Sequence, residues 1–250
     1  MKISATVQFH NELEFLSGWF ASAKNYADEI ICGSHNATDG SLEYVKDQAA
    51  TSEIPITILE FPQDTVYRHG FSFIKNALIK KAVGDWIVSL DADEEMDIDK
   101  KTFGPLTQRC TGISTQTMHI AYTDPHWSLC NRQQIRNEAK WQQQRHWRVF
   151  RNGFDIKWHG LIHESLRFNG LHISNVSKNT VIKMYHFGAL ADSNKRTFKD
   201  GLYAELLLRA EDNTDLRYGT DKWWFDTFIP QNREKLTKDR NEYRATITTT

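Results

Sequence analysis

The sequence predicts an α/β fold in which a mainly parallel sheet is flanked by helices. Short apolar runs alternate with segments of helical spacing through residues 1–98. This alternation is typical of βαβ units, which build parallel sheets. One apolar run, residues 86–90, leads directly into a cluster of acidic residues. Because ligands bind outside the carboxyl ends of parallel strands, this cluster marks the edge where a site is expected.

The predicted elements follow the chain in order. In the first half, strands are expected at residues 3–9, 30–33, 54–61 and 86–90, and helices at residues 12–25, 40–50 and 71–82. After residue 99 the pattern loosens. There we expect a helix at 100–109, strands at 113–122, 146–150 and 181–185, and helices at 195–210 and 231–244. The second half is therefore predicted in less detail than the first.

Composition restricts the class of protein. Hydrophobic residues make up 40% and charged residues 25% of the 250 residues, which is ordinary for a globular protein. The 31 Lys and Arg nearly balance the 32 Asp and Glu, so no overall field attracts nucleic acid or anionic lipid. The three cysteines have no close spacing, which fits a reducing compartment. No window reaches the roughly 20 apolar residues of a membrane span. A cytoplasmic protein without stable membrane insertion is expected.

The strongest chemical signal is the run from Gly84 to Glu95, where an apolar strand ends in Asp91-Ala92-Asp93. Two carboxylates one residue apart raise each other's pKa unless a cation shares them. Such oxygen ligands suit Mg²⁺ or Mn²⁺ carrying a diphosphate. A solvated acidic loop is the alternative, because Asp-x-Asp pairs are common.

Five blocks in order resemble the N-terminal signature of the family-2 glycosyltransferases. The blocks are His-Asn-Glu at 10–12, Ala-Asp-Glu-Ile-Ile at 27–31, Thr-Asp-Gly-Ser at 38–41, Gly-Phe and Lys-Asn within 70–76, and the strand with its Asp-x-Asp at 84–93. The resemblance implies the Rossmann-like GT-A fold. It also implies a nucleotide-diphosphate sugar as the donor and Mn²⁺ or Mg²⁺ as the cofactor.

The resemblance extends more weakly downstream. Residues 146–151, 159–164 and 185–188 look like blocks of a subgroup that includes lipopolysaccharide-core sugar transferases. By this resemblance His186 is a further metal ligand, and Glu164 is the base that takes the proton from the acceptor hydroxyl. A salt bridge from Glu164 to Arg148 or Arg151, and a core position for His186, are the alternatives.

The resemblance also assigns the remaining site residues. Asp91, Asp93 and His186 are the expected metal ligands, and Asp93 and Glu164 are the expected catalytic residues. Ser34 stands where the family has an aspartate that commonly contacts uracil, so the base of the donor stays open. The expected nucleotide-sugar-binding residues are Phe9, Asn11, Glu12, Ser34, Asp39, Lys75, Asp91 and Ala92.

The resemblance implies a metal-dependent, inverting glycosyltransferase. We expect a GT-A domain over residues 1–190, divided into a nucleotide-binding half (1–98) and an acceptor half (99–190), and a helical extension over 191–250. The expected acceptor is a glycan, a lipid or lipid-linked sugar, a protein or another hydroxyl compound. Transfer to hydroxylated DNA bases, as in phage enzymes, is one alternative, and an inactive module that binds carbohydrate or nucleotide is another. Trp127, Trp223 and Trp224 are candidates to stack on acceptor sugar rings, although a core role is commoner for tryptophan.

Overall fold

The computed structural model describes residues 1–107, 110–121, 126–127, 130–190, 193–213, 217, 220 and 222–248. The strands of the larger sheet are β1 (Ile3–Phe9), β2 (Glu29–His35), β3 (Ile56–Phe61), β4 (Trp86–Ser89), β5 (Glu94–Asp97), β6 (Gly112–Ile120), β7 (Trp141–Arg151) and β11 (Ser177–His186). The smaller sheet contains β8 (Ile156–His159), β9 (Ser165–Phe168) and β10 (Leu171–His172).

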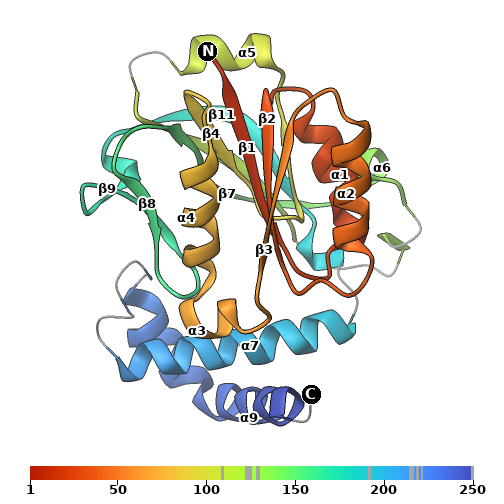
Figure 1. Cartoon of the computed structure of the whole chain (residues 1–250). Coiled ribbons are helices and arrows are strands. Elements are labelled where there is room, and N and C mark those ends of the chain that lie inside the picture. Colours follow the sequence, from red (N-terminus) through yellow and green to blue (C-terminus); the bar gives the residue numbers. More distant parts are fainter. Residues whose placement is uncertain are drawn as a thin grey trace.

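Helices flank the larger sheet (Figure 1). They are α1 (Leu13–Ala23), α2 (Ser41–Thr51), α3 (Thr65–His69), α4 (Phe71–Lys81), α5 (Lys100–Leu106), α6 (Arg132–Glu138), α7 (Ser193–Asp212) and α9 (Ile229–Thr248). A short π-helix, Trp224–Phe228, precedes α9.

The first half of the chain forms the parallel part of the larger sheet. Its strand order begins β3-β2-β1-β4, and all neighbouring pairs in this part are parallel. Since β1 lies between β2 and β4, the order reverses beside β1. The carboxyl ends of these strands meet at one edge, and ligands of open α/β sheets bind at such a reversal. The predicted α/β fold, with a mainly parallel sheet flanked by helices, is confirmed.

Alternation along β1 explains how the sheet is covered. Ile3, Ala5, Val7 and Phe9 point to one face, where they join a buried cluster with the apolar stripe of α1. That stripe consists of Leu16, Trp19, Phe20 and Ala23. The opposite face is covered by α4, whose Ile74 and Leu78 are buried. Both faces are therefore closed, and only the strand ends are open to a ligand.

The second half continues the sheet in the order β4-β7-β6-β11-β5. β7 is antiparallel to β4 and β6, and β11 is parallel to β6. β5 follows β4 closely in the chain but pairs with β11, so that His186 lies opposite Glu94. The acidic segment between β4 and β5 therefore passes the end of β11. This path places the Asp-x-Asp residues beside His186.

The C-terminal helices cover α3 and α4. Leu202 and Leu206 of α7, Ile229 of α9 and the buried Val66 and Ile74 belong to one apolar cluster. In Figure 1, α7 and α9 lie side by side below the sheet. No helix among the described residues is both long enough and apolar enough to cross a membrane.

Several elements differ from the sequence prediction. The polar segment 131–145 forms α6 and the first part of β7, so the strand predicted at 146–150 begins at Trp141 instead. β5, α3 and the strands β8 to β10 were not predicted. Residue 122, the predicted end of a strand, lies outside the described residues, and β6 ends at Ile120.

Candidate active site

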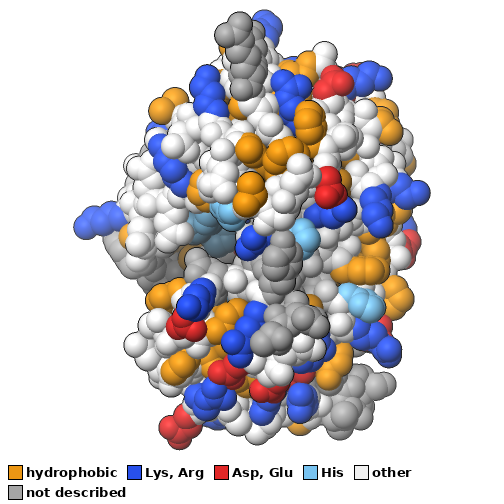
Figure 2. Space-filling view, turned by 90° about the vertical axis from the view of Figure 1, so that its left-hand side faces the viewer, with side chains coloured by type: hydrophobic (Ala, Val, Ile, Leu, Met, Phe, Trp, Pro, Cys, Tyr) orange, Lys and Arg blue, Asp and Glu red, His pale blue; other side chains and the backbone are white. Residues whose placement is uncertain are grey.

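A cavity of about 930 Å³ opens at the edge where β1 and β4 end. Figure 2 shows one face of the molecule hollowed beside a group of histidine side chains. Segments far apart in the sequence line this cavity: the ends of β1 and β11, the loop after β4, the middle of β7, the segment around Glu164, and α7. The predicted site residues that line it are Phe9, Asn11, Glu12, Lys75, Asp91, Ala92, Asp93, Glu164 and His186.

Two predicted nucleotide-binding residues do not line the cavity. Ser34 is buried within β2. Asp39 binds the first residues of two helices. Its Oδ2 accepts a hydrogen bond from the backbone N–H of Leu13 in α1 at 3.1 Å, and its Oδ1 accepts a hydrogen bond from the backbone N–H of Ser41 in α2 at 3.0 Å. Backbone N–H groups in a first helical turn lack partners within the helix, so a carboxylate there stabilises α1 and α2.

Asp91 is held between two cationic side chains. Lys75 Nζ lies 2.9 Å from Asp91 Oδ1, and Arg148 Nη2 lies 2.7 Å from Asp91 Oδ2. Burial alone would raise the pKa of Asp91, but Arg148 and Lys75 outweigh it and hold that pKa well below its usual range. Both oxygens of this carboxylate are therefore engaged within the protein.

The same cations reach two further carboxylates. Arg148 Nη2 lies 2.6 Å from Glu94 Oε1, and Glu94 Oε2 accepts a hydrogen bond from the backbone N–H of Asp91 at 2.9 Å. Lys75 Nζ lies 2.7 Å from Glu164 Oε1. Although burial lowers the pKa of Lys75, Asp91 and Glu164 raise it above its ordinary value. An alternating chain of charges thus runs from Glu94 to Glu164. The ion pair of Glu164 is with Lys75, not with Arg148 or Arg151 as the sequence suggested.

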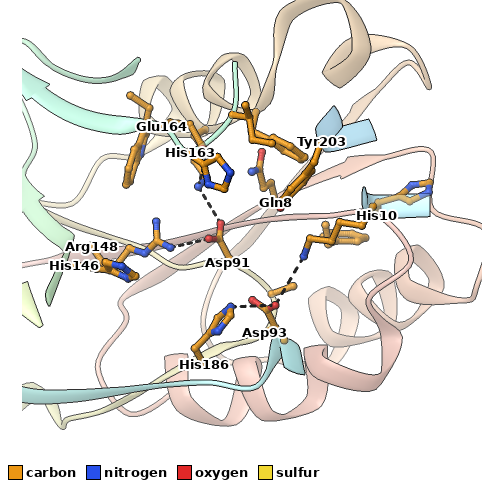
Figure 3. Close-up of a pocket in the computed structure, with 18 of the residues that line it drawn as sticks. Gln8, His10, Asp91, Asp93, His146, Arg148, His163, Glu164, His186 and Tyr203 are labelled. Atoms are coloured by element: carbon orange, nitrogen blue, oxygen red, sulfur yellow. Dashed lines mark hydrogen bonds and ion pairs between the residues drawn. The ribbon is translucent and has the colours of Figure 1, made fainter. Parts of the chain in front are cut away.

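Asp93 has a different environment. Its Oδ2 lies 3.4 Å from His186 Nε2, and its carbonyl accepts a hydrogen bond from the backbone N–H of Phe187 at 2.8 Å. Burial lowers the pKa of His186, but Asp93 more than reverses this and raises it to about 9. In Figure 3, Glu164 and Asp93 lie on opposite sides of Asp91, with His186 beside Asp93.

The three predicted metal ligands are not gathered into one set. Asp93 and His186 lie together, whereas Asp91 contacts Lys75 and Arg148. Within the part of the chain that the structure describes, no group of three or more His, Cys, Asp or Glu residues is arranged to hold a metal ion.

The structure also brings in residues that the sequence did not single out. His119 Nδ1 lies 3.1 Å from His186 Nδ1, because the two residues are register partners on β6 and β11. Lys199 of α7 lines the cavity, with its Nζ 4.0 Å from Asp93 Oδ2. His163 and Tyr203 also line the cavity. His163 lay within a block that was noted, but no spacing rule predicts which residue of α7 reaches the site.

Comparison with known proteins identifies the family. The profile described as glycosyl transferase family 2 matches residues 4–166, well over half of the chain. The chain belongs to glycosyl transferase family 2. A TPR repeat-containing protein of Synechococcus elongatus is 31% identical over 101 residues, which are 40% of this chain and 23% of that protein. The family-2 chain therefore spans less than a quarter of that relative.

Two solved structures show the fold of this family-2 chain. S. aureus TarS aligns with a TM-score of 0.50 and 15% identity, over 85% of this chain and 44% of that chain. S. aureus TarS 1–349 in complex with UDP aligns with a TM-score of 0.51 and 13% identity, over 94% of this chain and 72% of that chain. The family-2 chain thus covers less than half of the first TarS chain. At these identities the likeness concerns the fold, and it agrees with the predicted GT-A architecture.

Proposed function

We propose that this family-2 chain transfers a sugar from a nucleotide-diphosphate sugar to an acceptor hydroxyl, with inversion at the anomeric carbon. The observation that carries the proposal is one cavity lined by Asp93, Asp91, Lys75 and Glu164, in which Lys75 pairs with both Asp91 and Glu164. A donor bound at Asp93 and an acceptor bound at Glu164 would meet beside Asp91. The related fold of TarS 1–349 holds UDP, so a nucleoside diphosphate is the first ligand to test.

Asp93 and His186 fit a divalent cation that the substrate completes. They present a carboxylate oxygen and an imidazole nitrogen 3.4 Å apart at the cavity. Gly188 keeps this place open, because a Cβ there would lie 2.4 Å from Asp93 Oδ2. Mg²⁺ and similar ions take few protein ligands when phosphate oxygens and water supply the rest. When bound, Mn²⁺ or Mg²⁺ would supply Lewis-acid stabilisation of the charge that develops on the leaving diphosphate.

Glu164 is the proposed general base. It is 10% exposed, and Lys75 Nζ holds its Oε1 at 2.7 Å. In the reaction it takes the proton from the acceptor hydroxyl while that oxygen bonds to the anomeric carbon and the bond to the diphosphate breaks. A positioned base contributes about 10²–10⁴-fold in rate. Lys75 also contacts Asp91, so one ammonium group aligns the carboxylates of the donor and acceptor sides.

The acceptor wall favours a carbohydrate. Trp147, Trp158 and His172 line the same cavity as Glu164, and flat aromatic faces suit sugar rings. In contrast, Trp127 is buried in a cluster with Phe15 and is a core residue. We therefore propose a hexosyl- or pentosyltransferase acting on a sugar hydroxyl. Membership of the lipopolysaccharide-core subgroup, and the division into residues 1–98, 99–190 and 191–250, stay predictions.

Thermal-shift measurements with UDP- and GDP-sugars, with and without Mn²⁺, test this proposal. A ligand at 100 times its Kd stabilises the folded state by about 2.7 kcal/mol, so the matching donor should raise the Tm in the presence of Mn²⁺. The Asp93→Asn variant should lose the Mn²⁺-dependent part of the shift, measured from the Tm of the ligand-free variant. If no nucleotide shifts the Tm, the proposal is wrong. A shift without turnover would instead indicate the inactive binding module.

A further inference from the structure

The segment that carries Glu164 is fastened from two sides. On one side, the backbone N–H of Phe71 at the start of α4 donates to the carbonyl of Leu161 at 2.9 Å. On the other side, Thr220 forms a β-bridge with Glu164, and its hydroxyl donates to the carbonyl of Ile162 at 2.9 Å. The second set of contacts comes from the C-terminal part of the chain. This part lies beyond residue 166, where the family match ends.

His163, the residue before Glu164, has an unusual backbone conformation. Its φ is 50°, in the left-handed region that residues other than glycine rarely adopt. Such a conformation persists only where the surroundings hold it, and it is found mainly at functional sites. Two aromatic side chains hold His163. Trp224 stacks on the imidazole with ring centroids 3.6 Å apart and planes 7° apart, and Tyr203 lies edge-on at 5.8 Å.

Trp224 has aromatic neighbours of its own. It begins the π-helix that precedes α9, and such π-helical turns are rare and are often found at functional sites. Trp223 and Phe228 lie against it at centroid distances of 5.2 Å and 4.8 Å. One face of Trp224 is covered by His163, and Trp224 is not among the residues that line the cavity, so stacking of this ring on an acceptor sugar stays a prediction. Trp223 is 49% exposed and does not line the cavity.

We propose that Trp224 is a positioning residue for Glu164. By stacking on His163, it holds the segment 160–164 in the conformation that brings the Glu164 carboxylate to Lys75 and into the cavity. The inference rests on the proposed function, because the place of Glu164 matters for rate only if it acts on the acceptor. The C-terminal π-helix is then part of the active site.

Three variants of the full chain test this role: Trp224→Ala, Trp224→Phe and, as the neighbouring control, Trp223→Ala. The first readout is hydrogen–deuterium exchange of the peptide spanning residues 158–166. Without the stacked indole, exchange in this peptide should be at least about tenfold faster, because local opening becomes easier. Trp224→Phe keeps a stacked ring and should remain close to wild type, and so should Trp223→Ala.

The second readout is hydrolysis of UDP-glucose, UDP-N-acetylglucosamine and GDP-mannose with Mn²⁺, where water takes the place of the acceptor. A displacement of about 1 Å can cost about 100-fold in rate. Trp224→Ala should therefore lower kcat by roughly 10- to 100-fold and leave the KM for the donor unchanged. Trp224→Phe should restore most of the rate, which a general loss of folding would not allow.

The possible outcomes separate this inference from the proposed function. Exchange and kcat equal to those of Trp223→Ala would overturn the role of Trp224. So would a raised KM with normal kcat, or a Phe variant as slow as the Ala variant. If Glu164→Gln keeps wild-type turnover, the proposed base is wrong. If the wild type turns over no donor, the proposed function fails, and the exchange result alone decides whether Trp224 holds the segment.

Discussion

Replacing Arg148 by methionine should strongly destabilise the folded protein. Arg148 is 13% exposed and bridges Asp91 and Glu94 at 2.7 Å and 2.6 Å. Glu94 is only 1% exposed, so the variant leaves a buried carboxylate without its cationic partner. Breaking a buried ion pair in this way costs about 3–5 kcal/mol. Most of that cost is the unpaired Glu94, so the double variant Arg148→Met/Glu94→Gln should recover part of it.

Urea unfolding followed by tryptophan fluorescence measures this loss. Arg145 on the same strand supplies the control, because its Nη1 donates to uncharged groups, the hydroxyl of Ser114 and the carbonyl of Thr180. Arg145→Met should therefore cost only about 1 kcal/mol. If Arg148→Met and Arg145→Met lowered the free energy of unfolding equally, the buried charge chain would not contribute as described.

Three further predictions concern the cavity and the core. Gly188→Ala should weaken Mn²⁺ binding in the presence of nucleotide, because the new Cβ would lie 2.4 Å from Asp93 Oδ2. Electron paramagnetic resonance measures this affinity, and an unchanged value would show that Asp93 does not bind the cation. Lys199→Met should weaken the binding of a nucleoside diphosphate roughly tenfold in calorimetry but leave the binding of the nucleoside unchanged, since a hydrogen bond to a charged group is worth about 1.5–3 kcal/mol. Equal loss of affinity for both ligands would argue against a contact between Lys199 and the phosphates. Burial raises the pKa of the Cys32 thiol. At pH 8 this thiol should therefore not react with a thiol reagent until urea unfolds the chain. Labelling of Cys32 in the native protein would contradict its buried position.

The sequence predicts the first half of the fold well because its signals are local. Each strand from β1 to β4 is an apolar run, and α1 and α4 bury apolar residues at helical spacing. β5 was missed because Glu94-Glu95-Met96-Asp97 looks like a solvated acidic loop. Glu94 and Glu95 are buried because distant arginines reach them: Arg148 contacts Glu94, and Arg136 of α6 contacts Glu95. Such pairings between distant segments leave no periodic signal.

The sequence also does not predict the contacts that individual site residues make. A motif indicates which residues gather near the strand ends, but not which of them face the ligand. Asp39 belongs to a matching block, yet its carboxylate caps two helices. Asp91 was predicted to hold a metal, yet it contacts Lys75 and Arg148. The stack of Trp224 on His163 joins residues 61 positions apart, and no local pattern in the sequence indicates it.

The configuration of the released sugar tests single displacement most directly. The wild-type protein is supplied with Mn²⁺ and the α-linked nucleotide sugar that stabilises it, with water as the acceptor, and the product is followed by ¹H NMR from the first minutes. Inversion predicts that the β-anomer of the sugar appears first, and that Asp93→Asn and Glu164→Gln release almost none. Initial formation of the α-anomer, or undiminished release by Asp93→Asn, would contradict the proposed mechanism.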